Sequence, residues 1–90
     1  MHFRVLDLAA ERSVWSVPPF DMVPLKLRAE KLMVRSIDAN ANLLGMEPVD
    51  GMNLERAIER LFADRRAARL RIHLAIDDSY AGRVERFDVR

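Results

Sequence analysis

The stretch Leu54–Asp77 reads LERAIERLFADRRAARLRIHLAID and decides the fold, because its two halves follow different periods. In the first half, apolar residues recur at intervals of three and four, which is typical of an amphipathic helix. The helical stripe consists of Leu54, Ala57, Ile58, Leu61 and Phe62. From Leu70 to Asp77, apolar and polar residues alternate, which predicts a half-buried strand. One side of that strand carries Leu70, Ile72, Leu74 and Ile76, and the other carries Arg69, Arg71, His73 and Asp77.

The joint between this helix and this strand is rich in arginine. From Arg56 to Arg71 the chain reads RAIERLFADRRAARLR and contains six arginines. A guanidinium group can contact a carboxylate or a phosphate with two parallel hydrogen bonds. We therefore expect a partner to bind at this joint. The candidate partner-binding residues here are Arg65, Arg66, Arg69 and Arg71.

Upstream, residues Leu25–Leu44 have two interpretations. As one helix, the segment would start after Pro24, a residue tolerated in a first turn, and stop at Gly45. One face of that helix would contain Leu25, Ala29, Leu32, Met33, Ile37, Asn40 and Leu44. Alternatively, Leu25–Ala29 alternates as a strand does, and Leu32–Val34 would begin a second strand. The single helix accounts for more positions, so we expect a helix here.

The remaining segments are expected to be strands and connections. Phe3–Leu8 and Val14–Val17 favour an N-terminal hairpin that ends at Pro18 and Pro19. Residues 46–52 read as a loop, and Asn53 is a candidate N-cap. Residues 77–82 form a turn and residues 83–89 the last strand, with a bulge near Glu85 or Arg86 to explain the odd spacing of its apolar residues.

Together these elements predict one α+β domain over residues 1–90 in the order β-β-α-α-β-β. We expect an antiparallel sheet with both helices packed on one face and the other face in contact with water. The solvated face would carry Arg69, Arg71, His73 and Asp77.

Composition excludes several functions. The 90 residues contain no cysteine, which excludes disulfides, thiolate metal sites and cysteine nucleophiles. The two histidines lack metal-ligand spacing, and neither a phosphate-binding glycine loop nor a serine nucleophile motif is present. We therefore expect no catalysis, cofactor or metal. No apolar run is long enough to span a membrane and the N-terminus does not read as a signal peptide, so we expect a cytoplasmic protein.

A protein-binding module is the function that this sequence favours. Trp15, Phe20 and Met22 lie in connectors, and aromatic, methionine and arginine side chains suit interaction surfaces. We expect an adaptor, an accessory subunit or a small inhibitor of a larger complex. The excess of arginine over lysine, thirteen to two, fits a GC-rich bacterial or phage genome. A homodimer through an edge strand is a further expectation.

Two alternatives remain. The Arg56–Arg71 cluster could bind nucleic acid, although the net charge is only +1 and acidic residues are interleaved. Second, the segment Ala39-Asn40-Ala41-Asn42-Leu43-Leu44-Gly45-Met46 resembles a PAS sensor domain segment in which an asparagine precedes a short helix ending in Leu-Gly. The resemblance implies a sensory or dimerisation domain, but the chain ends where that family has a final central strand.

Overall fold

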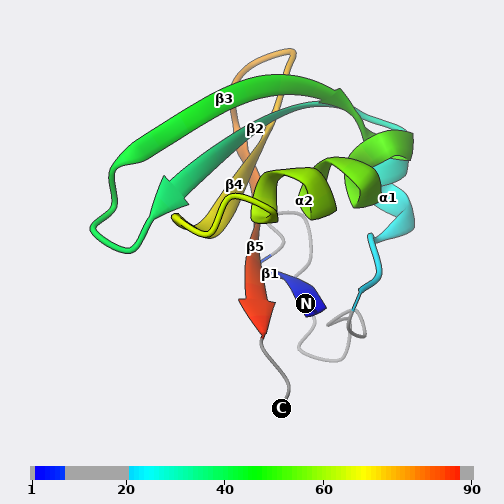
Figure 1. Cartoon of the computed structure of the whole chain (residues 1–90). Helices are drawn as coiled ribbons and strands as arrows, with labels where there is room; N and C mark the ends of the chain where they lie inside the picture. Colours follow the sequence, from blue (N-terminus) through cyan, green and yellow to red (C-terminus); the bar gives the residue numbers. More distant parts are fainter. Residues whose placement is uncertain (1, 8–20, 88–90) are drawn as a thin grey trace.

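The computed structural model describes residues 2–7 and 21–87. It contains one five-stranded antiparallel sheet with the strand order β1-β5-β4-β2-β3, and two helices (Figure 1). The expected small α+β fold is therefore confirmed. The elements are β1 (His2–Leu6), α1 (Leu25–Arg28), β2 (Lys31–Asp38), β3 (Leu43–Asp50), the 3-10 turn η2 (Gly51–Asn53), α2 (Leu54–Phe62), β4 (Ala67–Leu74) and β5 (Tyr80–Phe87).

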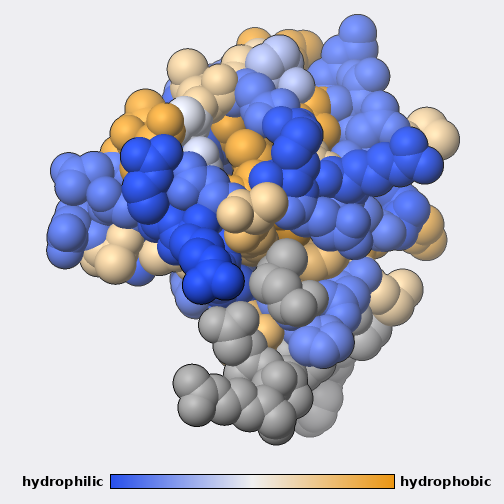
Figure 2. All heavy atoms as spheres, viewed as in Figure 1, coloured by the Kyte–Doolittle hydropathy of each residue, from blue (hydrophilic) through white to orange (hydrophobic). Residues whose placement is uncertain are grey.

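Both helices contribute to a single core on one face of the sheet. Strands β2 and β3 curve over the helices, and α2 lies beneath them (Figure 1). The predicted stripe of α2 is confirmed, since four of its residues are buried and Leu61 packs against the core. The fully buried side chains with the largest volumes are Leu32, Leu54, Ile58, Leu70, Ile72, Val5, Val34 and Val84. Seen from the helix side, hydrophilic residues cover much of the surface around scattered hydrophobic groups (Figure 2).

The single helix predicted over Leu25–Leu44 is wrong. Only Leu25–Arg28 is helical, and Lys31–Asp38 is strand β2, so the strand interpretation was correct from Leu32 onwards. Leu32, Val34 and Ser36 are buried on the helix side, whereas the residues between them face away. The apolar spacing fits a helix as well, but pairing with β3 on one side and β4 on the other stabilises the extended chain.

The loop predicted at residues 46–52 is also wrong for most of its length. Residues 46–50 belong to β3, which forms a hairpin with β2. The PAS-like segment therefore lies in the hairpin turn and the start of β3, so the short helix on which that resemblance depends is absent. Helix α2 begins directly after Asn53, as expected, but the Asn53 side chain makes no capping hydrogen bond.

The last two strands are present, with shifted bounds. Strand β4 runs from Ala67 to Leu74, so Ile76 lies in the following turn and is 88% exposed. Strand β5 starts at Tyr80, and no register shift occurs near Glu85 or Arg86. The irregularity lies instead between Ile72 and His73.

The N-terminal strand has a long-range partner. Strand β1 pairs with β5 across the whole of its length, whereas the second strand of the expected hairpin, Val14–Val17, lies outside the described residues. This pairing places β1 at one edge of the sheet, beside β5.

Candidate functional site

Three arginines form a row across three adjacent strands on the face of the sheet opposite the helices. Arg35 of β2 lies directly opposite Arg71 of β4, and Arg71 lies directly opposite Arg83 of β5. Neighbouring strands are about 4.8 Å apart, so the three side chains emerge close together. Like charges in directly opposed positions destabilise a sheet, and the row therefore needs compensating negative charge.

The two outer arginines of the row have carboxylate partners. Arg35 donates from Nη2 to both oxygens of Asp78, at 2.9 and 3.0 Å. Arg83 lies 3.2 Å from a carboxylate oxygen of Glu85 and 3.5 Å from one of Asp7. These ion pairs offset the charge of Arg35 and Arg83 within the protein.

The central arginine has no such partner. Arg71 is exposed and forms no ion pair with the residues that the structure describes. Its guanidinium carbon lies 5.1 Å from the centre of the Tyr80 ring, a cation–π contact that leaves its N–H donors free for a ligand. Arg69, two residues before it on the same face, likewise makes no ion pair with the described residues.

A hollow of about 380 Å³ lies beside this row. Arg69, Arg71 and Arg83 line it from β4 and β5. The rest of its lining consists of Asp7, Ile37, Ala41 and Tyr80. Three guanidinium groups and one carboxylate give the lining a net charge of +2, so the hollow favours an anion.

Tyr80 fixes one wall of this hollow. Its hydroxyl donates to Asp7 at 3.0 Å, and its ring meets that of His73 edge to face at 5.7 Å. Burial, with the hydrogen bond to Asp7, raises the pKa of the Tyr80 hydroxyl, so it remains a protonated donor at neutral pH. The tyrosine thus anchors the end of β1 to β5.

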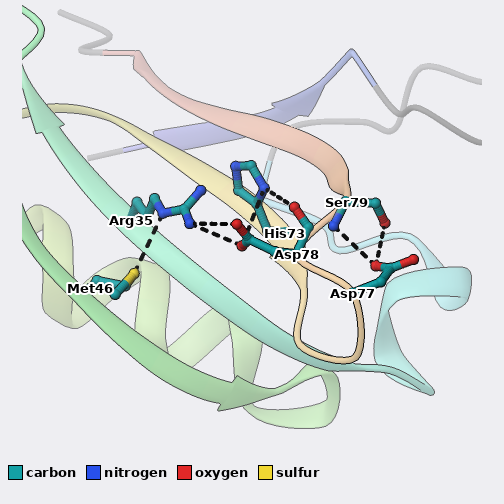
Figure 3. A network of polar contacts seen from close by, with 6 residues as sticks. All are labelled: Arg35, Met46, His73, Asp77, Asp78 and Ser79. Atoms are coloured by element: carbon teal, nitrogen blue, oxygen red, sulfur yellow. Dashed lines mark hydrogen bonds and ion pairs between the residues drawn. The ribbon is translucent and has the colours of Figure 1, made fainter.

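A polar network holds the neighbouring part of the face (Figure 3). His73 is buried, and its Nδ1 is 2.9 Å from the Asp78 carbonyl oxygen. Because a carbonyl oxygen only accepts, Nδ1 carries the proton in this contact. Arg35 also donates from Nε to the sulfur of Met46 at 3.4 Å, which links β2, β3 and the β4–β5 turn. The prediction that Asp77 lies on the solvated face is wrong, because β4 ends at Leu74 and the Asp77 carboxylate accepts hydrogen bonds from Ser79 within the following turn.

The structure separates the predicted arginine cluster into three groups. Arg69 and Arg71 lie on the solvated sheet face, as predicted. Arg65 and Arg66 lie in the turn between α2 and β4, where Arg66 pairs with Asp64 at 2.8 Å. Hydrogen bonds from the Arg66 side chain and from its backbone N–H lower the pKa of Asp64 to about 2.

The first part of the cluster lies on α2. Arg60 forms a bidentate ion pair with Glu47 of β3, at 2.8 and 2.7 Å, and lowers the pKa of that carboxyl group. Arg56 is exposed beside this pair. The six arginines therefore do not form one surface.

The predicted apolar contact residues are only partly described. Met22 is 49% exposed just before α1 and does not line the hollow beside the arginine row. Trp15 and Phe20 lie outside the described residues. The hollow beside the row is instead lined by Arg83 and Tyr80 of β5 and by Asp7, which follows β1, and none of these three residues was predicted from the sequence.

Both edges of the sheet are obstructed. On β1, Asp21 occupies the outward backbone groups of Phe3: the Asp21 side chain accepts from its N–H at 2.9 Å, and the Asp21 N–H donates to its carbonyl at 2.8 Å. At the end of β3, the Gly51 N–H donates to the Glu30 carbonyl, on the side of β2. Because successive amides of a strand point to opposite sides, the β2–β3 register directs the amides of alternate residues toward β2 and leaves position 48 facing outward. That position is Pro48, which has no N–H. The edge-strand homodimer stays a prediction that these features disfavour.

Other site types find no support in residues 2–7 and 21–87. Within those ranges no helix is both long and apolar enough to cross a membrane. No group of three or more histidine, aspartate or glutamate side chains in the same ranges could hold a metal ion.

Fold and site together define a small α+β domain with an arginine-lined sheet face. Residues 9–86 match the model of the family DUF1203, which is described as a protein of unknown function, and the chain belongs to this family. No curated protein and no solved structure matches the chain.

Proposed function

We propose that this protein is a non-enzymatic, cytoplasmic binding module that recognises an acidic segment of another protein on the helix-free face of its sheet. The observation that supports this proposal is Arg71, which stands between Arg35 and Arg83 without a carboxylate of its own. A carboxylate from a partner would supply the missing negative charge and accept two hydrogen bonds from the guanidinium group. Such a module would serve as an adaptor, an accessory subunit or an inhibitor.

The surroundings of the row suit a protein segment. Exposed apolar side chains flank it, with Met46 54% exposed and Leu43 58% exposed on the neighbouring β3. Apolar contacts beside charged anchors are typical of protein interfaces. The carboxylates of Asp7, Asp78 and Glu85 interrupt the positive surface, which would repel a continuous phosphate backbone.

Single-stranded nucleic acid is the second candidate. Tyr80 lies in the hollow with a guanidinium group over its ring, and arginine with an aromatic residue is a combination that stacks on bases. Only one aromatic residue lines the hollow, however, and a strand of several nucleotides would need a longer platform. The two candidates differ in whether nuclease removes the partner.

The test is comparative affinity capture from lysate of the source organism, with and without nuclease, followed by quantitative mass spectrometry. The baits are the wild type, the double variant Arg69→Gln/Arg71→Gln, and the control Arg56→Gln/Arg65→Gln. The control removes the same charge from exposed positions outside the hollow. Melting temperatures of the three baits establish that all are folded.

The expected result is a protein that the wild type and the control capture equally and that the Arg69/Arg71 variant loses about tenfold or more, as expected for loss of a charged hot spot. The loss should be independent of nuclease. Equal capture by all three folded baits would remove the arginine row from the interface. Capture that disappears with nuclease would replace protein by nucleic acid as the partner.

A further inference from the structure

We infer that the hollow beside the arginine row receives a phosphomonoester group, carried on a phosphorylated side chain of the partner segment. This inference rests on the proposed function and specifies its ligand. The inference distinguishes between two ligands that the arginines would bind, a carboxylate with one negative charge and a phosphoryl group with nearly two.

The charge of the hollow favours the phosphoryl group. Arg83 is already paired with Asp7 and Glu85, whereas Arg69 and Arg71 form no ion pair with described residues, so two uncompensated positive charges face the hollow. A phosphomonoester carries about −1.5 to −2 charges near neutral pH and would neutralise this lining. A single carboxylate would neutralise only half of it, and it would share the hollow with the carboxylate of Asp7.

The donors are arranged for several acceptor oxygens. Arg71 and Arg83 are directly opposed across β4 and β5, and Arg69 enters from the next position on the same face. Two of these arginines, Arg69 and Arg71, form no ion pair with described residues and keep their guanidinium donors available. A phosphoryl group has three terminal oxygens, which allows contacts with more than one guanidinium group.

The size of the hollow indicates more than a bare ion. Its volume of about 380 Å³ lies at the lower end of the range for small-ligand pockets. Ile37 of β2, which is paired with Arg69, and Ala41 of the β2–β3 turn form part of its wall, and the Tyr80 ring adds a further apolar surface. These walls would accommodate the carbon atoms of a side chain that presents the phosphoryl group to the arginines.

The test compares three degenerate peptide libraries with a fixed central residue: phosphoserine, glutamate or serine. Binding to the full chain is measured by fluorescence anisotropy at constant salt concentration. Two-dimensional NMR follows the arginine Nε–H signals during the same titrations. The variants are Arg71→Gln and the control Arg65→Gln, an exposed arginine outside the hollow. Inorganic phosphate and a single-stranded oligonucleotide serve as competitors.

The expected result is that the phosphoserine library binds about tenfold more tightly than the glutamate library, because charge-assisted contacts to a dianion are stronger and more numerous. Arg71→Gln should abolish this difference, whereas Arg65→Gln should preserve it. The Nε–H signals that shift should be those of Arg69, Arg71 and Arg83. Inorganic phosphate should compete only at much higher concentration than the phosphopeptides.

Three outcomes would overturn the inference. Equal binding of the phosphoserine and glutamate libraries, lost in Arg71→Gln, would leave the proposed function intact and refute the phosphoryl preference. Binding of neither library would contradict both. An oligonucleotide or inorganic phosphate that displaces the phosphopeptides at equal or lower concentration would assign the hollow to nucleic acid or to a free anion.

Discussion

Gly51 lies at the closest approach between the start of η2 and the helix α1. Its N–H donates to the Glu30 carbonyl at 2.8 Å, and the residue is buried. A Cβ at this position would collide with the carbonyl group of Leu27, a backbone group that cannot move without displacing α1. The requirement is for space, because no glycine among the described residues has a positive φ.

Gly51→Ala should therefore lower the free energy of unfolding by about 2 kcal/mol or more, since the clash involves two backbone segments. Urea denaturation followed by circular dichroism measures the change. The control is Gly45→Ala, where the nearest atom to the added Cβ is the Ser36 hydroxyl at 3.6 Å. A similar loss of stability in both variants would show that Gly51 is not specially constrained.

At the scale of elements, helix α2 is held to the sheet by its apolar stripe and by one charged side chain. Arg86 of β5 donates from Nη2 to the carbonyls of Phe62 and Asp64, at 2.6 and 3.2 Å, and its guanidinium carbon lies 4.7 Å from the centre of the Phe62 ring. Terminal helix carbonyls lack partners within the helix, and a cation at this end also interacts favourably with the helix dipole.

We predict that Arg86→Met destabilises the protein by about 1–3 kcal/mol, because two part-buried carbonyls lose their donor while the apolar part of the side chain is kept. Hydrogen exchange should accelerate most at the C-terminal turn of α2. Arg56→Met, on the exposed side of the same helix, should change stability by less than about 0.5 kcal/mol. Uniform acceleration across the sheet would argue against a local role of Arg86 at the helix end.

The role of Arg86 also explains why β5 was misread from its sequence. Val84 and Phe87 are separated by three positions, which indicated a bulge. In the structure, Arg86 takes the core-side position after Val84, and Phe87 faces the other side of the sheet opposite His2. The alternation is regular, but a partly buried arginine occupies an apolar position.

Other elements were predictable where the apolar residues follow only one period, either that of a helix or that of a strand. Helix α2 and strand β4 each show a single clear period, and both are present. Between Leu25 and Leu44, Leu32 and Leu25 fit a helical face while Leu32 and Val34 fit a strand face. The choice depends on pairing of β2 with β3 and β4, which a local pattern does not contain.

The residues of the candidate site were likewise only partly predictable from the sequence. Arg69 and Arg71 were predicted because they alternate with core residues on one recognisable strand. Arg83, Tyr80 and Asp7 were missed, because the β4–β5 register and the β1–β5 pairing bring them to the same hollow. With the register known, the opposed pair Arg71 and Arg83 would have been the signal.

At the scale of the whole molecule, both edges of the sheet discourage addition of another strand. We predict that Pro48→Thr, which restores an outward N–H on β3, promotes self-association at high protein concentration. Sedimentation equilibrium should show a monomer for the wild type and a concentration-dependent dimer for the variant. Met46→Thr, which changes an outward-facing position without adding a backbone donor, is the control. Identical masses for all three proteins would mean that Pro48 does not protect this edge.

The strand order β1-β5-β4-β2-β3 also sets a sequence of events during synthesis. Residues 31–74 suffice to form the β2–β3 hairpin and to add β4. Strand β1 is made before all of these, yet in the described sheet its only neighbour is β5. Because its partner strand is synthesised after all the others in the sheet, β1 cannot pair until residues 80–87 have left the ribosome. The hollow, which needs Asp7 beside Arg83, is therefore assembled last, and the proposed binding requires that β5 has been made.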